Sequence, residues 1–269
     1  MTRSYGIIGW PLGHTMSPAL HNHGFARLGL DARYEAWPLE PKDLPAFMER
    51  VRSVPIHGLS VTIPHKRAVM ACLDRISDRA KAVGAVNTVY WDGDRLCGEN
   101  TDVIGVAASL RTLAPLPRSA VVLGAGGAAR AALAAFRELG IPRVAVSNRT
   151  RAKADALAAE FGVECVKWTE RMDFPWELVC NATPLGMAGA MEGETPFDAA
   201  RLAENAVAYD IVYNPLETRF LAEARAAGRR IVSGLEMFLH QGLAQFRLWT
   251  GQDMNEAEAR RLLLSILRQ

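Results

Sequence analysis

The chain has 269 residues, of which 49% are hydrophobic and 22% are charged, and its formal net charge is +2. This length and composition are typical of a globular enzyme with one large domain or two ordinary ones. The basic residues are scattered and build no basic stripe, so neither a nucleic-acid partner nor an anionic membrane is expected. The N-terminal apolar run is too short for a signal peptide, and no segment approaches the roughly 20 apolar residues of a membrane span. We therefore expect a cytoplasmic protein.

No metal site and no disulfide are expected. The cysteines lie in apolar segments without CxxC spacing, which indicates small buried hydrophobic side chains. His21 and His23 are two residues apart, and that spacing puts side chains on different faces of a helix. The four cysteines are Cys72, Cys97, Cys165 and Cys180.

The first hundred residues alternate strand-like and helix-like segments, which predicts a parallel α/β sheet. Ser17 followed by Pro18 is typical of a helix N-cap and first turn. A hairpin with a Gly-containing turn closes this module. The expected strands are 5–8, 33–37 and 56–61, the expected helices begin at 17 and span 41–51, and the hairpin pairs 86–90 with 95–97.

A second α/β module begins after the prolines at 115 and 117. Two amphipathic helices follow it with no strand between them. The expected helices are 101–113, 128–139, 152–161, 218–227, 235–248 and 257–267, and the expected strands are 119–123, 144–146, 178–181, 206–211 and 230–232.

The strand 119–123 runs directly into a glycine-rich turn that fits G-x-G-x-x-A. Gly124 permits the tight turn, Gly126 lets the backbone approach a pyrophosphate, and Ala129 lets the next helix pack close to the sheet. Amides at the positive end of that helix then face the phosphates. The residues expected to bind the nucleotide here are Gly124, Ala125, Gly126, Gly127 and Ala128.

The end of the next strand favours NADP(H) over NAD(H). NAD-binding proteins carry an acid there for the ribose 2′-hydroxyl, whereas this chain has Arg149, with Arg151 and Lys153 close behind. A guanidinium can pair with a 2′-phosphate. Solvated charges opening a helix would be the alternative, but cations at a helix N-terminus oppose its dipole. The set expected to bind the adenosine end is Asn148, Arg149, Thr150 and Lys153.

Four polar segments of the first module fall at the ends of strands, a location where open α/β sheets bind ligands. Their hydroxyl and amide side chains suit a small polyhydroxylated acid. The loops are 9–18, 60–66, 84–88 and 98–102.

These loops, together with five segments of the second module, resemble the shikimate dehydrogenase family in order and spacing. The resemblance runs over about residues 5–251, and many ordered matches are more specific than any one of them. The five further segments are 124–129, 148–150, 181–184, 209–215 and 234–237.

The resemblance implies an α/β protein with an N-terminal α/β substrate domain and a Rossmann-type, doubly wound NADP-binding domain. The C-terminal helices are expected to return to the first domain. The expected boundaries are 1–101 with 236–269 for the substrate-binding and catalytic domain, and 102–235 for the NADP-binding domain.

The resemblance also implies roles for single residues. Lys66 and Asp102 match the catalytic pair. Ile211 and Gly234 match places where the backbone approaches the nicotinamide, and Asp78 matches a position near the cofactor. The residues that match substrate-binding positions are Thr15, Ser17, Thr62, Asn87, Asp102, Tyr213 and Gln241.

Three departures from the family pattern bear on the site. Thr15 stands where serine is more frequent and keeps the hydroxyl while adding a methyl group. Ser60 replaces a frequent asparagine, which puts one amide contact in question, and Glu236 stands where many members have glycine.

The implied reaction is reduction of 3-dehydroshikimate to shikimate by NADPH. Hydride transfer to a ketone develops negative charge on the oxygen, so the site needs a proton donor. Burial lowers the pKa of a lysine and a neighbouring carboxylate raises it, so the sequence leaves open whether Lys66 or Asp102 carries the proton.

Other interpretations stay open. A quinate or aminoshikimate dehydrogenase of the same family differs at one ring position, and a non-catalytic NADP-sensing protein would keep the fold alone. A folate-linked dehydrogenase is disfavoured by the Thr15 and Ser17 loop. The oligomeric state is undecided, with a homodimer as one alternative.

Overall fold

The computed structural model describes residues 2–13 and 15–268, so His14 of the first polar loop lies outside the described residues. The chain folds into two compact units, Met1–Thr101 with Gln241–Gln269, and Asp102–His240. The C-terminal segment thus joins the first hundred residues.

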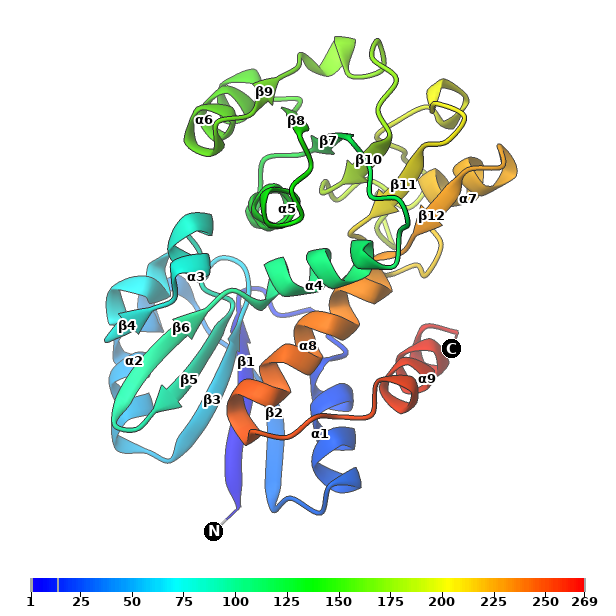
Figure 1. Ribbon diagram of the computed structural model, residues 1–269. Coiled ribbons are helices and arrows are strands. Elements are labelled where there is room, and N and C mark those ends of the chain that lie inside the picture. Colours follow the sequence, from blue (N-terminus) through cyan, green and yellow to red (C-terminus); the bar gives the residue numbers. More distant parts are fainter. Residues whose placement is uncertain (1, 14, 269) are drawn as a thin grey trace. The chain divides into compact units, whose positions relative to one another are not determined.

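The N-terminal unit contains a six-stranded mixed sheet of order β2-β1-β3-β5-β6-β4 (Figure 1). β1, β2 and β3 run parallel, as the alternation of strands and helices predicts, and the expected hairpin adds the antiparallel strands β5 and β6. The strands are β1 (Arg3–Gly9), β2 (Ala32–Pro38), β3 (Ile56–Val61), β4 (Arg75–Ile76), β5 (Thr88–Asp92) and β6 (Arg95–Glu99).

Helices of this unit begin where proline or a capping side chain allows. Pro45 has no amide hydrogen, so the expected helix 41–51 divides into the 3₁₀ turn η1 (Pro41–Asp43) and α2 (Leu44–Ser53). The predicted N-cap at Ser17 was wrong: Met16 is the cap, and the Ser17 amide donates to Thr15 Oγ1 at 3.2 Å. The other helices are α1 (Ser17–Arg27), η2 (Ala68–Cys72), α3 (Asp78–Val83) and α9 (Glu256–Leu267).

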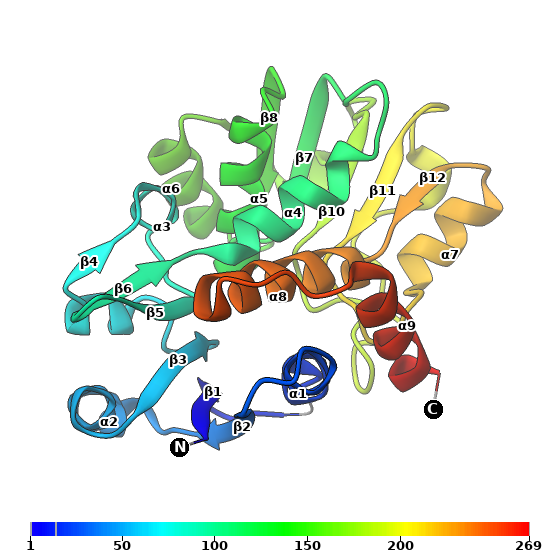
Figure 2. The same ribbon diagram turned by 60° about the horizontal axis from the view of Figure 1, so that its bottom comes forward.

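The second unit contains a six-stranded parallel sheet of order β12-β11-β10-β7-β8-β9. The chain leaves β7 in one direction for β8 and β9 and then returns to the other side for β10, so the strand order reverses between β7 and β10. Right-handed crossovers then put α5 and α6 on one face of the sheet and α7 on the other (Figure 2). This is the doubly wound fold, with its ligand-binding crevice expected at the reversal.

The strands of this sheet are β7 (Ser119–Leu123), β8 (Arg143–Ser147), β9 (Glu164–Cys165), β10 (Leu178–Asn181), β11 (Val207–Asp210) and β12 (Arg230–Val232). The helices are α4 (Thr101–Arg111), α5 (Gly127–Glu138), α6 (Arg151–Phe161), η3 (Trp168–Glu170), η4 (Ala199–Arg201), α7 (Arg219–Ala226) and α8 (Gly234–Thr250). The alanines of α5 are buried, which lets this helix pack closely. α8 is continuous, with Gly234–His240 in the second unit and Gln241–Thr250 in the first.

Each unit has its own hydrophobic core, which anchors the strands that carry the loops of the candidate site. The core of the first unit includes Leu59, Val61 and Val89. The core of the second unit includes Trp176, Phe197 and Phe220. Across residues 2–13 and 15–268, no helix is long and apolar enough to cross a membrane.

Candidate active site

The loop after β1 brings two predicted substrate ligands together. Thr15 Oγ1 lies 3.2 Å from both the amide and the hydroxyl of Ser17. Gly9 ends β1, and a Cβ there would collide with the Thr62 methyl group, so glycine at this position keeps the ends of β1 and β3 close. Thr62 is itself anchored by its amide, which donates to Ile8 O at 2.9 Å.

Several hydrogen bonds fix the side chain of Asn87, a predicted substrate ligand. Its Oδ1 accepts from the Thr101 amide at 2.7 Å and from the Thr88 hydroxyl at 2.8 Å. Its Nδ2 donates to Thr101 Oγ1 at 3.0 Å. All three residues are buried, so the carboxamide has one orientation and lies against the first residue of α4.

The two predicted catalytic residues each follow a strand of the first sheet. Lys66 lies half-buried in the turn after β3, where its carbonyl accepts from the Val86 amide at 2.8 Å. Asp102 lies in the first turn of α4, directly after Thr101, and is 7% exposed. A capping role for Asp102 is excluded, because the helix already includes Thr101. Neither side chain is a freely solvated surface charge.

The glycine turn after β7 has the geometry that phosphate binding needs. Gly124 has φ +117°, and a Cβ there would lie 2.7 Å from Ala182 O. Gly126 caps α5 without a side-chain hydrogen bond, and its missing Cβ would meet no protein atom within 4 Å. The space beside Gly126 is thus open at the start of the 12-residue helix α5, whose first amides have no partner within the helix, and this fits a pyrophosphate group.

These two glycines give a matched pair of variants. We expect Gly124→Ala to lower the free energy of unfolding by about 2 kcal/mol, because alanine is strained at this φ and meets Ala182. Gly126→Ala should leave the melting temperature unchanged and raise KM for NADP+ by about tenfold or more, because its methyl group enters only the open space. Thermal melts and cofactor titrations check both. A normal KM for NADP+ in Gly126→Ala would argue that no phosphate approaches this turn.

The predicted adenosine end carries two cations that are available to a ligand. Arg151 pairs with Asp155 at 2.7 Å. Arg149 and Lys153 are exposed, and within the described part of the chain neither forms an ion pair. Asn148 Nδ2 donates to Thr150 O at 2.9 Å and shapes the loop. Arg149 and Lys153 can therefore receive a 2′-phosphate without breaking a protein contact.

The ends of β10 and β11 are braced by the buried carboxylate of Asp210. Its Oδ1 accepts from Asn181 Nδ2 at 3.0 Å and from the Val212 amide at 2.9 Å, and its Oδ2 accepts from the Thr218 hydroxyl at 2.6 Å. The Ile211 amide donates to Asn181 O at 2.9 Å. Asp210 was not predicted from the sequence as a site residue, although it fixes the loop in which Ile211 stands.

The start of α8 packs against this same loop. A Cβ at Gly234 would collide with the carbonyls of Ile211 and Val212, so glycine here allows α8 to begin directly beside the loop. The ring of Tyr213 lies 4.9 Å from that of Phe238, and burial raises the pKa of Tyr213. Tyr213 is thus a neutral hydrogen-bonding group.

Burial raises the pKa of Asp210 from 3.8 to about 6, with its three donors partly offsetting the effect. Between about pH 4 and pH 6 the unfolded chain has released this proton while the folded protein keeps it, so the free energy of unfolding falls as pH rises. The neighbouring Cys180 and Tyr209 have pKa values raised by burial and stay neutral in this window.

Asp210→Asn removes this titration and keeps the contacts, because an amide oxygen can replace Oδ1 and an amide nitrogen can donate to the Thr218 hydroxyl. We expect the stability of the wild type relative to Asp210→Asn to fall by up to about 3 kcal/mol between about pH 4 and pH 7. Urea unfolding at several pH values measures it. A constant difference across the window would contradict the raised pKa.

Comparisons with known proteins agree with this arrangement. Family models match at residues 7–89 (shikimate dehydrogenase substrate binding domain), 111–174 (shikimate / quinate 5-dehydrogenase) and 234–264 (shikimate 5′-dehydrogenase C-terminal domain). A shikimate dehydrogenase (NADP(+)) from Maridesulfovibrio salexigens is 50% identical over 263 residues, which cover 98% of this chain and 97% of that relative. The chain belongs to the shikimate dehydrogenase family.

Solved structures of the family share the whole fold. Shikimate 5-dehydrogenase from Thermus thermophilus, in complex with NADP(H) and shikimate, is 39% identical with TM-score 0.89, and the match covers 98% of this chain and 99% of that one. Quinate dehydrogenase from Corynebacterium glutamicum, in complex with NAD, is 32% identical with TM-score 0.92, and the match covers 98% and 99%. The fold is therefore shared by shikimate and quinate enzymes, and it confirms the two-domain Rossmann architecture.

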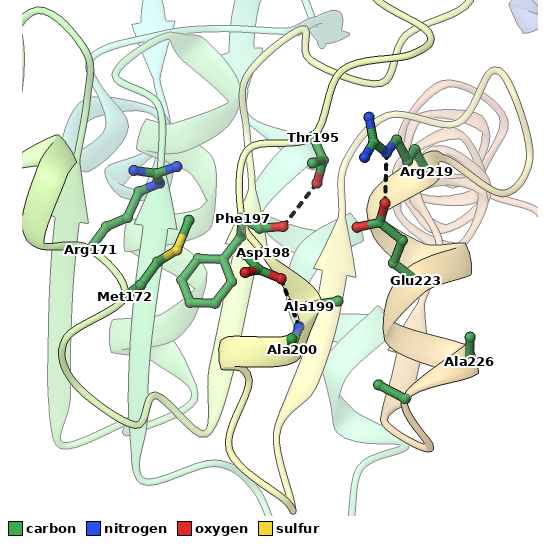
Figure 3. A pocket seen from close by; sticks show the side chains of 11 residues that line it. Arg171, Met172, Thr195, Phe197, Asp198, Ala199, Ala200, Arg219, Glu223 and Ala226 are labelled. Carbon is green, nitrogen blue, oxygen red and sulfur yellow. Dashed lines mark hydrogen bonds and ion pairs between the residues drawn. The ribbon is translucent and has the colours of Figure 1, made fainter.

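A large recess of the second unit is lined by none of the predicted site residues. It has a volume of about 650 Å³, with Arg171 and Arg219 on opposite sides (Figure 3). Arg171 Nε donates to Pro196 O at 2.7 Å, and Arg219 Nε donates to Glu223 at 2.6 Å. Both side chains thus have partners within the protein, and the recess is not the candidate active site because no predicted site residue lines it.

Two further predicted residues are Asp78 and Gln241. Asp78 is fully exposed in the first turn of α3 and lies 3.5 Å from Lys81. Gln241 is 9% exposed and is the first residue of α8 in the N-terminal unit. Glu236, the departure from glycine, lies 3.8 Å from His240 one turn along α8. The ligand roles of Asp78 and Gln241 stay predictions.

Proposed function

We propose that this chain is an NADP-dependent shikimate dehydrogenase, which reversibly reduces 3-dehydroshikimate to shikimate in the biosynthesis of chorismate and the aromatic amino acids. The observation that carries the proposal is the 50% identity, over 98% of the chain, to a shikimate dehydrogenase (NADP(+)). The chain also retains Lys66, Asp102 and Arg149 in the settings described above.

Residues of the second unit are proposed to hold the cofactor, and their local geometry fits it. The amides at the start of α5 bind the pyrophosphate, and Arg149 and Lys153 bind the 2′-phosphate. The backbone at Ile211 and Gly234 faces the nicotinamide half. When bound, NADPH supplies the hydride, and NADP+ accepts it in the reverse direction.

Residues of the polar loops of the first unit, together with Tyr213 and Gln241, are proposed to hold the substrate. Thr15 and Ser17 donate to its carboxylate, since hydroxyl hydrogens suit an anion. Thr62, Asn87, Tyr213 and Gln241 contact the carboxylate or the ring hydroxyls.

Lys66 and Asp102 are proposed to act on the oxygen that changes from ketone to alcohol. As hydride adds to the carbon, the oxygen becomes negative, and Lys66 Nζ donates a proton to it. In the oxidation direction the same nitrogen removes the hydroxyl proton. Asp102 accepts a hydrogen bond from the reacting group or from Lys66 and thereby orients the pair.

A quinate dehydrogenase is the second candidate, because a quinate enzyme at 32% identity shares the fold. The exposed cation Arg149 favours NADP over the NAD present in that structure. Values of kcat/KM for shikimate and quinate, each with NADP+ and NAD+, decide between them. We expect shikimate with NADP+ to give the highest value. A higher kcat/KM for quinate would overturn the proposal. No reduction of NADP+ with any cyclohexene acid would also overturn it and would favour an NADP-sensing protein.

We also propose a cytoplasmic location. The cysteines are free thiols, which suits a reducing compartment. Light scattering of the purified protein distinguishes a monomer from the homodimer left open by the sequence.

A further inference from the structure

A chain of buried hydrogen bonds crosses the interior of the N-terminal unit. The Tyr34 hydroxyl donates to Ser60 Oγ at 2.6 Å, and Ser60 Oγ donates to Gln245 Oε1 at 2.9 Å. Gln245 Nε2 donates to Thr88 Oγ1 at 3.0 Å. The chain thus links β2, β3, α8 and β5.

This chain ends on the carboxamide of Asn87. The Thr88 hydroxyl that accepts from Gln245 donates to Asn87 Oδ1 at 2.8 Å. Gln245 Nε2 also lies 3.3 Å from the Asn87 carbonyl. Both the backbone and the side chain of Asn87 are therefore held from the side of α8.

Backbone groups at the two ends fix the direction of every donor. The Asn87 carbonyl can only accept, so the Gln245 amide must present nitrogen to it and oxygen to Ser60. Ser60 must then donate to Gln245 and accept from Tyr34. At the other end the Thr101 amide can only donate, so it holds Asn87 Oδ1 toward itself. Asn87 is consequently fixed with its nitrogen on the donor side, where Nδ2 also donates to Thr101 Oγ1 at 3.0 Å.

Because these polar groups are buried, the hydrogen-bond chain stabilises the fold only if each group has its partner. Tyr34, Gln245 and Asn87 are each 2% exposed, Ser60 is 4% exposed, and Thr88 is fully buried. A buried polar group without a partner is strongly unfavourable, so the loss of one link should disturb the next. Apolar side chains would be enough if these positions served only to pack the interior.

Tyr34, the first residue of the hydrogen-bond chain, is itself held in place. Asn22 bonds to both the carbonyl and the amide of Tyr34, at 2.9 and 2.8 Å, and the His21 ring stacks on Tyr34 at 4.6 Å. Burial raises the pKa of Tyr34, and its polar interactions with Ser60 and Ser17 partly offset this. Tyr34 is therefore held through both its backbone and its ring at the start of the hydrogen-bond chain that leads to Asn87.

We propose that Gln245, with Ser60 and Tyr34, positions the Asn87 amide so that its nitrogen donates a hydrogen bond to an oxygen of the cyclic hydroxy acid. Ser60 thus supports Asn87 through the hydrogen-bond chain. It does not replace the amide contact that the family asparagine provides at this position. The inference rests on the proposed function, because it takes Asn87 to be a substrate ligand.

The test replaces the links with side chains of similar size. In Gln245→Met we expect KM for shikimate to rise by about tenfold, the loss expected for a weakened buried hydrogen bond, while KM for NADP+ changes by less than about twofold. Tyr34→Phe removes only the first donor and should raise KM for shikimate by about threefold. The Tyr34→Phe variant still tests the proposal if Gln245→Met does not fold.

The matched control is Trp91→Phe. Trp91 Nε1 donates to Ile56 O at 2.8 Å in the same sheet, a hydrogen bond that is separate from those linking Tyr34 to Asn87. This variant loses one side-chain hydrogen bond of the same unit, so its KM for shikimate should stay within about twofold. An equal rise in Trp91→Phe would overturn the positioning role, because a general loosening of the sheet would then explain the result.

A double-mutant cycle with Asn87→Ala decides whether the effect passes through Asn87. Once the amide is gone, Gln245→Met or Tyr34→Phe should change KM for shikimate by less than about twofold. Full additivity would overturn the proposal. If Asn87→Ala alone leaves shikimate kinetics unchanged, the role of Asn87 in the proposed function fails instead. If the wild type does not oxidise shikimate, the proposed function itself fails.

Discussion

Lys66→Met is expected to lower kcat for shikimate oxidation by about 100-fold or more, while KM for shikimate changes by less than about fivefold. A group that moves a proton in the transition state contributes mainly to kcat. The substitution keeps the half-buried aliphatic stem and the backbone bond from Val86 to the Lys66 carbonyl, so the turn after β3 should keep its shape. Steady-state kinetics with saturating NADP+ measures the effect.

The control for this variant is Lys42→Met, because Lys42 is an exposed lysine of the same unit that pairs with Glu40. Its kcat should equal that of the wild type. Asp102→Asn separates the two proton carriers left open by the sequence: a smaller loss than in Lys66→Met assigns the proton to lysine. An unchanged kcat in Lys66→Met would remove lysine from the chemistry and leave it at most a binding role.

Arg149→Glu is expected to lower kcat/KM for NADP+ by about 100-fold or more and to raise the ratio of NAD+ to NADP+ use. Arg149 is an exposed cation at the end of β8 with no ion pair in the described structure, so the substitution breaks no internal contact. A carboxylate there repels a 2′-phosphate and can accept from the 2′-hydroxyl of NAD. Initial rates with both cofactors at saturating shikimate give the ratio.

Arg137→Gln is the matched control, because Arg137 is an exposed arginine in the last turn of α5, at the helix end away from the glycine turn. Its kinetics with both cofactors should be unchanged. If Arg149→Glu kept the wild-type preference for NADP+, the assignment of the 2′-phosphate to this loop would be wrong. An equal loss with both cofactors would point instead to a damaged domain.

The architecture could be predicted from the sequence because glycines and prolines mark the ends of many strands and helices. Strand 119–123 coincides with β7, and the turn after it contains Gly124 in a conformation that disfavours other residues. The two-residue strands β4 and β9 were not predicted, since two residues carry no periodicity. α3 was also missed, although Ser77 caps it and Gly84 ends it with φ +67°, a signal that could have located it.

The candidate site was predicted less completely, because its supporting residues meet only in three dimensions. Gln245 follows Gln241 by four residues on one helix, and such spacing puts two amides on one face, but their partners could not be read from the chain. Tyr34 and Ser60 come from different strands. Asp210 stood within a family-matched segment, yet only the buried hydrogen bonds to Asn181, Val212 and Thr218 reveal its bracing role.

The most direct test of the proposed function is product identification from one reaction. Purified protein is incubated with shikimate and NADP+, and the products are followed by cofactor absorbance and by NMR of the ring. We predict one NADPH formed for each shikimate consumed, with 3-dehydroshikimate as the organic product, and the reverse reaction when NADPH and 3-dehydroshikimate are supplied. Binding of NADP+ without any oxidation of shikimate would contradict the proposed function.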